Sequence, residues 1–431
     1  MPTDTAAAHR AIEAVWRLES ARIIAGLAGL LRDVGLAEEL AQDALVVALE
    51  QWPARGIPAN PGAWLMLTAK HRAIDRIRRN ERLGDKLNLL GRELEATQQD
   101  PAAELDAVLD DEKIDDDLLR LMFISCHPVL STESRIALTL RLLGGLTTEE
   151  IARGFLAAEP TIAKRIVRAK GTLASKEVPF EVPPPTERPA RLASVLEVLY
   201  LVFNEGYSAT TGDDWMRPAL CSEALRLGRM LAELMPAEPE VHGLVALMEI
   251  QASRIPARLR RSGTPVPLLE QNRGRWDQLL IRRGFTALLR AERLGGPPGP
   301  YLLQAAIAAC HARARTAAET DWAKIATLYQ VLIAVAPSPV IELNRAVAVA
   351  MADDPERGLQ ITDGLAAEPA LAGYHHLPSV RGDLLAKLGR YAEATEEFRR
   401  AASLTRNIPE RTLLLQRAAD CSAMMEPTDI V

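Results

Sequence analysis

The chain has 431 residues, of which 48% are hydrophobic and 25% charged, and its formal net charge is −6. No apolar run approaches the roughly 18 residues of a membrane-spanning helix, and the N-terminus lacks the pattern of a signal peptide. The four cysteines form no C-x-x-C pair, which argues against a disulfide scaffold or a four-cysteine zinc site and predicts a cytoplasmic protein. The net charge alone argues against nucleic acid as a partner. The abundance of Ala, Leu, Glu and Arg favours an all-α fold.

Apolar residues recur at steps of three and four through most of the chain, which is the pattern of amphipathic helices. Three prolines within 53–61 interrupt the pattern, and we expect the acidic stretch before Asp117 to be extended or loosely ordered. Prolines at 179–189 predict a linker, and a succession of helices is expected from about residue 190. Before that linker, the pattern predicts helices over 18–31, 36–52, 63–82, 117–125, 132–143 and 147–176.

Charge is distributed in blocks along the first 176 residues. Residues 70–86 contain seven Lys or Arg against three acids, residues 93–117 contain eleven acids and one Lys, and residues 159–176 contain five basic residues against one acid. Two basic segments on either side of an acidic one indicate two polyanion-binding modules joined by an acidic linker. The alternative is that each run is merely the solvated face of a helix.

Residues 147–173 have the pattern of a helix-turn-helix. Thr147 and the acids after it resemble a capping box, and Ile162 and Ile166 are expected to face inward from the second helix. An exposed second helix with short polar and basic side chains suits the major groove of DNA. Leu156 stands where glycine is common, so the turn must be satisfied differently, and an ordinary helical hairpin remains the alternative. The outward residues are Thr161, Lys164, Arg165 and Arg168.

The stretch from 36 to 82 contains A-E-E-L-A-Q-D-A-L-V-V-A-L-E-Q-W, a Pro/Gly loop and W-L-M-L-T-A-K-H-R-A-I-D-R-I-R-R. It resembles region 2 of the extracytoplasmic-function sigma factors of the sigma-70 family, and the helix-turn-helix resembles their region 4. The resemblance implies that Glu39, Gln42 and Asp43 dock on core RNA polymerase, and that the helix at 159–176 recognises the −35 element. It also implies −10 contacts from the loop at 55–62 and the helix after it, through Arg55, Asn60, Trp64, Lys70, Arg72, Arg76 and Arg79.

Two residues of this stretch have a simpler interpretation. Asp75 lies at helical spacing from Arg72 and Arg79, so we expect it to pair with one of them rather than to contact a base. Trp64 is expected to pack in the core more than to stack on a base. The implied domains are region 2 at 1–90, an acidic linker at 91–117, region 4 at 118–178, the proline-rich linker at 179–189, and a helical domain at 190–425.

The C-terminal part resembles tetratricopeptide repeats. The clearest copy is R-G-D-L-L-A-K-L-G-R-Y-A-E-A-T-E-E-F-R-R-A, in which Gly382, Tyr391 and Phe398 occupy small and large positions of the helical pair. A weaker copy precedes it by 36 residues, when Ala346 is aligned with Gly382. Such arrays bind a protein or peptide ligand in a groove, and a purely scaffolding role is the alternative.

The combination of regions 2 and 4 with this extension resembles a subgroup of the same sigma factors that contains Y-L-V-F-N-E-G-Y, R-W-D and N-R-A-V-A. Members usually lack a dedicated anti-sigma partner, which implies that the extension modulates activity. The first two strings predict a polar junction between region 4 and the repeats. The junction residues are Glu205, Tyr207, Arg275, Trp276 and Asp277.

No catalytic or metal-binding pattern is evident. His375 and His376 are adjacent, as are the cysteine–histidine pairs at 126–127 and 310–311, and adjacent residues point in different directions on a helix. We therefore expect no enzyme activity, no cofactor and no metal. The favoured prediction is a transcription initiation factor that brings core RNA polymerase to promoter DNA. The alternative is a stand-alone helix-turn-helix regulator with a peptide-sensing repeat domain.

Overall fold

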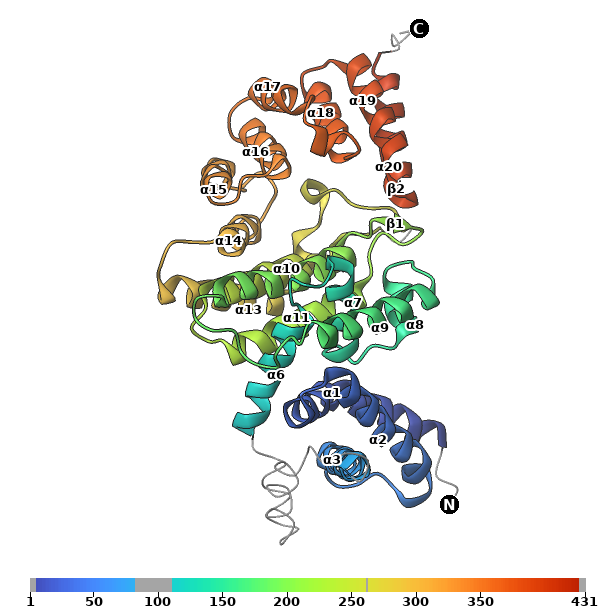
Figure 1. Ribbon diagram of the computed structural model, residues 1–431. Coiled ribbons are helices and arrows are strands. Elements are labelled where there is room, and N and C mark those ends of the chain that lie inside the picture. The colour runs from blue at the N-terminus through green and yellow to red at the C-terminus, as the bar shows by residue number, and fades with distance from the viewer. Residues whose placement is uncertain (1–4, 82–110, 261–262, 426–431) are drawn as a thin grey trace. The chain divides into compact units, whose positions relative to one another are not determined.

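The computed structural model describes residues 5–81, 111–260 and 263–425, most of them in helices, which confirms the all-α prediction (Figure 1). Contacts divide the chain into two units, Met1–Leu199 and Tyr200–Val431. The first unit contains α1 (Thr5–Leu31), α2 (Val34–Arg55), α3 (Pro61–Glu81), α6 (Asp111–Ser125), α7 (Thr132–Leu142), α8 (Thr148–Gly154) and α9 (Glu159–Ser175). Helix α10 (Arg188–Tyr207) continues from the first unit into the second.

In the described residues, the second unit contains ten further α-helices, four short 3-10 helices and two short strands. Its α-helices are α11 (Pro218–Leu234), α12 (Pro239–Ala252), α13 (Gln278–Leu294), α14 (Pro300–Arg313), α15 (Trp322–Val335), α16 (Pro339–Ala352), α17 (Pro355–Leu365), α18 (His376–Lys387), α19 (Tyr391–Leu404) and α20 (Ile408–Ala423). The short 3-10 helices are η1 (Ile255–Ala257), η2 (Leu268–Glu270), η3 (Arg273–Arg275) and η4 (Pro369–Leu371), and the strands are β1 (Thr211–Gly212) and β2 (Arg406–Asn407).

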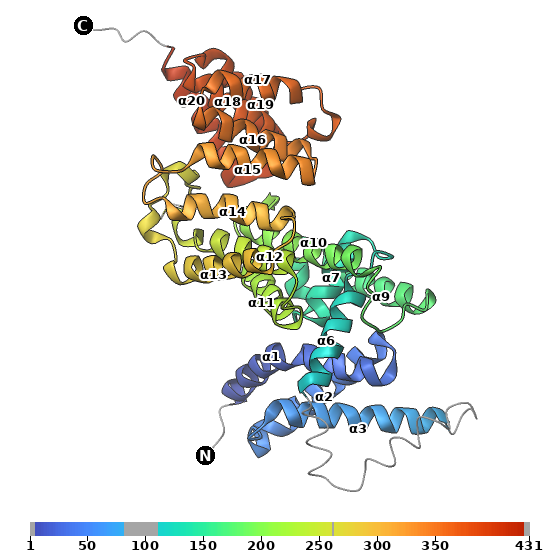
Figure 2. The same ribbon diagram turned by 90° about the vertical axis from the view of Figure 1, so that its left-hand side faces the viewer.

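Helices α1, α2 and α3 pack against one another at the start of the first unit (Figures 1 and 2). The side chain of Asp33 caps α2 by accepting a hydrogen bond from the backbone N–H of Leu36 at 3.0 Å. Helix α2 extends beyond the predicted end and includes Pro53 in its last turn. Helix α3 begins at Pro61, because proline is tolerated in the first turn of a helix, where its missing N–H would have no partner.

Helix α6 corrects the prediction that the acidic segment is extended or loosely ordered as far as Asp117. The helix begins at Asp111, and Ile114 and Leu118 are buried at a spacing of one turn. Helix α6 packs on α1, and the burial of these two side chains offsets the repulsion among the acids. Asp117 itself is only 3% exposed, and burial raises the pKa of its carboxyl although Arg120 pairs with it. The earlier acidic residues, within 82–110, lie outside the described part of the chain.

Helices α8 and α9 form the predicted helix-turn-helix. Thr147 and Glu150 make a reciprocal capping box at the start of α8, as the sequence indicates. Ile162 and Ile166 are buried, which confirms the predicted inward face of α9. The turn uses Leu156 in the left-handed backbone region, at φ 47°, where glycine would be unstrained.

The proline-rich segment before α10 packs on the first unit. Phe180 is 3% exposed, and its carbonyl oxygen accepts a hydrogen bond from the guanidinium of Arg32 at 3.2 Å. The start of α10 is also attached, because Arg191 donates to the carbonyl oxygen of Phe123 and Ser194 to that of Cys126, at 2.9 and 2.6 Å. Residues up to the middle of α10 therefore contribute to the structure of the first unit.

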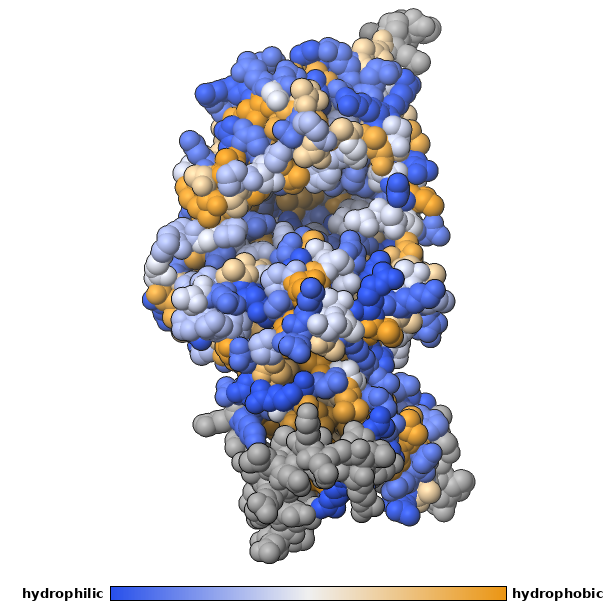
Figure 3. All heavy atoms as spheres, in the orientation of Figure 1, coloured by the Kyte–Doolittle hydropathy of each residue, from blue (hydrophilic) through white to orange (hydrophobic). Residues whose placement is uncertain are grey.

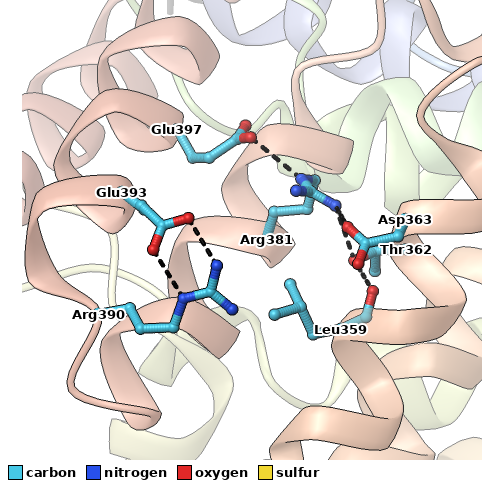
Figure 4. Close-up of polar contacts among 7 residues, drawn as sticks. All are labelled: Leu359, Thr362, Asp363, Arg381, Arg390, Glu393 and Glu397. Atoms are coloured by element: carbon cyan, nitrogen blue, oxygen red, sulfur yellow. Dashed lines mark hydrogen bonds and ion pairs between the residues drawn. The ribbon is translucent and has the colours of Figure 1, made fainter.

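In the second unit, successive helices pack against one another (Figures 1 and 2). The clearest predicted repeat is the pair α18–α19, where Gly382 leaves room for the Phe398 ring, since a Cβ at that position would lie 2.9 Å from it. Arg381 of the same pair holds three helices together: its Nε donates to Glu397 of α19 at 3.0 Å, and a terminal nitrogen pairs with Asp363 of α17 (Figure 4).

The first and last parts of the second unit meet at a short pairing of strands. Strand β1 pairs in parallel with β2, in the register Thr211 to Arg406 and Gly212 to Asn407 (Figure 1). The Asn407 side chain adds hydrogen bonds to the carbonyl oxygens of Ala209 and Asp214, at 3.0 and 3.1 Å. The loop before α11 is therefore attached to the segment before α20.

The exposed surface is mainly polar. Figure 3 shows hydrophobic residues in separate patches on a predominantly hydrophilic face. Among the described helices, none combines the length and the low charge needed to cross a bilayer.

Candidate nucleic-acid interface

Helix α9 presents a polar face to solvent. Thr161, Lys164 and Arg168 are exposed and Arg165 is half-buried, whereas the helix buries Ile162, Ile166, Ala169 and Leu173 and packs on α7 and α8. The four polar residues border a hollow of about 510 Å³, whose opposite wall includes Glu133 at the start of α7. Hydrogen bonds from its own backbone N–H and from Ser131 lower the pKa of Glu133, and the charge of Arg165 adds to this. The predicted −35 side chains thus share one accessible surface.

Helix α3 carries the basic residues of the predicted −10 surface. Arg76 is exposed, and Lys70 and Arg72 are half-buried. Arg72 pairs with Asp43 of α2, with 3.1 Å between a guanidinium nitrogen and a carboxylate oxygen. A residue predicted to contact DNA, Arg72, is therefore ion-paired with one predicted to contact polymerase, Asp43. The side chain of Arg79 lies outside the described residues.

Two of the predicted −10 residues, at and just after the start of α3, make contacts that stabilise the fold. The Asn60 side chain caps α3 by accepting from the backbone N–H of Ala63 at 3.0 Å. Trp64 is half-buried, and its ring meets that of the buried Trp52 edge-on, with 5.3 Å between centroids. The geometry agrees with the packing role expected for Trp64. Arg55 is exposed and donates to Gln51 within α2 at 3.3 Å.

Helix α2 places the predicted polymerase contacts next to a buried glutamate that the sequence analysis missed. Glu39 is exposed, and Gln42 and Asp43 are half-buried. Glu38 is 2% exposed, and its carboxylate pairs with Arg141 of α7 at 2.6 Å and with Lys170 of α9. Helical spacing does put Glu38 on the same face as buried Val34 and Ala41, but the partners lie more than 100 residues away.

Four of the five predicted junction residues have side-chain partners within the second unit. Glu205 pairs with Arg217, and the exposed Asp277 caps α13 by accepting from Leu279 N at 2.8 Å. Tyr207 and Trp276 come together around Arg254, whose guanidinium carbon lies 5.6 and 5.9 Å from their rings. Arg275 is exposed. Their role at a junction with region 4 stays a prediction.

A buried arginine beside these rings was not anticipated. Arg258 lies over Tyr207 at 3.5 Å and over Trp215 at 4.3 Å, and it donates to the Tyr207 carbonyl oxygen. Burial lowers the pKa of its guanidinium to about 10. No pattern in the sequence distinguishes this arginine from the exposed ones, because its partners lie up to 51 residues away.

The cysteine–histidine pairs lack the features of a nucleophile and base. Burial raises the pKa of the Cys126 thiol to about 11 and lowers that of the neighbouring His127 to about 4. Burial likewise raises the pKa of the Cys310 thiol and lowers that of His311 to about 3. A nucleophilic cysteine requires a lowered thiol pKa, so these thiols are packing residues.

A basic helix, a helix-turn-helix and an intervening acidic segment define a DNA-binding transcription factor with two binding modules. Family models agree with that division: Sigma-70 region 2 matches residues 18–83, Sigma-70 region 4 matches residues 120–173, and a family of unknown function (DUF6596) matches residues 191–292.

Several known proteins are similar to the chain. The ECF RNA polymerase sigma factor SigK of Mycolicibacterium vanbaalenii is 31% identical over 150 residues, which is 34% of this chain and 71% of the relative. The corresponding protein of Mycobacterium sp. strain KMS is 29% identical over 160 residues, 36% of this chain and 77% of the relative. An uncharacterized protein of Rhizobium meliloti is 43% identical over 379 residues, 88% of both chains.

The chain belongs to the ECF RNA polymerase sigma factors, a family that directs RNA polymerase to promoters. The favoured prediction from the sequence is thereby confirmed. A stand-alone regulator is disfavoured because the match extends over region 2 as well as the helix-turn-helix.

Proposed function

We propose that α2 docks on core polymerase, α3 and the loop before it bind the −10 element, and α9 binds the −35 element. The observation that carries this assignment is the polar face of α9, which holds Thr161, Lys164, Arg165 and Arg168 on one accessible surface while its apolar face is buried. A recognition helix needs this division, because phosphates and base edges are contacted by the exposed side chains alone. Binding, without catalysis, is the proposed mode of action.

The −35 assignment is tested by run-off transcription with Arg165→Ala. We expect transcription from promoters with a −35 element to fall by about tenfold, since one good base or phosphate contact is worth about 1–3 kcal/mol. The matched control is Lys176→Ala, which removes an exposed charge just beyond the C-terminal end of α9. An equal loss of transcription in both variants would mean that Arg165 acts through its charge alone and does not recognise the −35 element.

The polymerase assignment is best tested at Glu39. Asp43 is a less suitable position, because its replacement also releases Arg72 from their ion pair and so alters the DNA surface. Glu39 is exposed and forms no ion pair with any of the described residues. Glu39→Ala should weaken co-purification with core polymerase and leave binding to duplex DNA unchanged; undiminished polymerase binding would exclude Glu39 from the contact.

We also propose that the second unit modulates transcription through a protein or peptide ligand. Its support is the stack of helix pairs from α14 to α20, an arrangement that other proteins use to bind extended segments. A truncation that tests this should end after Tyr207, because a cut near residue 190 would remove Arg191 and Ser194 from the first unit. Unchanged run-off transcription by the truncated chain, with or without added lysate, would contradict the modulating role.

A further inference from the structure

Two helix ends in the second unit bring His375, His376 and Glu410 together. His375 immediately precedes α18, His376 is the first residue of that helix, and Glu410 lies in the first turn of α20. The centroids of the two imidazole rings lie 4.0 Å apart, and Nε2 of His375 lies 3.0 Å from a carboxylate oxygen of Glu410. One nitrogen of each histidine and one oxygen of Glu410 all lie within 4.8 Å of one another.

This arrangement differs from the expectation that adjacent histidines point in different directions. The expectation holds inside a helix, where neighbouring side chains diverge by about 100°. His375 is instead the residue before α18, and its ring comes to lie beside that of His376. The third group comes from α20, 34 residues further along the chain, so no spacing in the sequence indicates the cluster.

Hydrogen bonds from neighbouring residues fix the position of Glu410. The Glu410 carboxylate accepts a hydrogen bond from the hydroxyl of Thr405 at 2.8 Å, and the Glu410 backbone N–H donates to the Asn407 side chain at 3.1 Å. Such supporting contacts orient ligands in metal sites. Nε2 of His375 is buried, and apart from the nearby Glu410 oxygen it has no hydrogen-bond partner among the described residues. That single contact is with a group that could itself bind a metal ion.

The chemistry of the donors points to one class of ligand. Two imidazole nitrogens and one carboxylate oxygen form the three-residue set that Zn²⁺ takes with a fourth position open. In a tetrahedral site with bonds of about 2.0–2.1 Å, neighbouring donor atoms lie about 3.4 Å apart. The present separations of up to 4.8 Å therefore need side-chain movements of about an ångström. Magnesium and calcium prefer oxygen donors and would not select this set.

We infer that His375, His376 and Glu410 bind a divalent transition-metal ion of the zinc type. The site adjoins the attachment between the two ends of the second unit, because Glu410 follows β2, which pairs with β1. A bound ion would fix the start of α18 to the start of α20. It would thereby brace the segment whose Asn407 binds the loop before α11. Metal availability would then set the stability of this unit.

The test uses the full chain without a histidine tag, freed of metal by a chelator and titrated with ZnCl₂ by calorimetry. We expect one ion per chain and a rise in the unfolding midpoint on saturation. His376→Gln and Glu410→Gln should each weaken Zn²⁺ binding at least tenfold. The matched control is His9→Gln, because His9 is exposed at the other end of the chain and should leave binding unchanged.

Two further measurements keep the result independent of folding defects. Circular dichroism must show the same helix content for each variant, and anomalous scattering from wild-type crystals soaked in ZnCl₂ should place the ion between the three side chains. Binding that is absent in the wild type, or equal in wild type and both variants, would show that His375 and Glu410 form an ordinary ion pair and would overturn the proposal.

Discussion

Glu38 is expected to hold α2 against the helix-turn-helix. Its carboxylate is almost fully buried and pairs with Arg141 and Lys170, whose side chains are 22% and 23% exposed. Glu38→Ala would leave both cations without this partner. Removing one member of a buried ion pair costs about 3–5 kcal/mol. Because both cations can partly reach water, we expect a loss of about 2–3 kcal/mol in the free energy of unfolding of the first unit.

The assay is thermal unfolding of the full chain by calorimetry, with hydrogen exchange followed on peptides from α7 and α9. For a unit of this size, such a loss lowers the unfolding midpoint by about 4–10 °C. Glu38→Gln should have a smaller effect, because its amide oxygen can still accept from Arg141. The control is the exposed neighbour Glu39→Ala, which should unfold like the wild type. If Glu38→Ala and Glu39→Ala had the same midpoint and the same exchange rates, the reasoning from burial would be refuted.

Three further predictions concern a backbone dihedral angle, a steric contact and the pKa of a buried histidine. Leu156→Gly should stabilise the helix-turn-helix by about 0.5–1 kcal/mol, because glycine adopts φ 47° without strain; an unchanged or lower urea midpoint would contradict this. Gly29→Ala should lower the free energy of unfolding by about 1–3 kcal/mol, because its Cβ would lie 2.5 Å from a carboxylate oxygen of Asp117. Gly171→Ala is the control, since open space surrounds that position and the substitution should not destabilise the fold. Burial lowers the pKa of His311 to about 3, so the second unit should be fully stable above pH 6.5 and lose up to about 1.4 kcal/mol per pH unit as the pH falls from 6.5 towards 3. His311→Phe should flatten that slope in denaturation curves; an identical slope would exclude His311 as its source.

The helix-turn-helix was largely predictable from the sequence because its determinants are local. A threonine followed three residues later by a glutamate specifies the start of α8, and the spacing of Ile162 and Ile166 specifies the buried face of α9. Leu156 was recognised as an unusual turn residue, but its left-handed backbone could only be found in the structure. The beginning of α6 was missed because charge density was given more weight than the helical spacing of Ile114 and Leu118.

The contacts that the sequence could not indicate are those between distant segments. The Glu38 pairs, the Arg72–Asp43 pair and the cluster of His375, His376 and Glu410 each depend on side chains from different helices. A charged residue in one sequence gives no sign of whether tertiary packing will bury it. The basic and acidic blocks correctly indicated polyanion binding, although the net charge of −6 argued against it.

The most direct test of the proposed polymerase and promoter contacts is size-exclusion chromatography of the full chain mixed with core RNA polymerase, followed by run-off transcription from promoter DNA. We predict co-elution with core polymerase and transcripts that depend on the chain, with both reduced in Glu39→Ala. Failure to co-elute, together with undiminished binding to duplex DNA alone, would contradict the polymerase-docking role of α2.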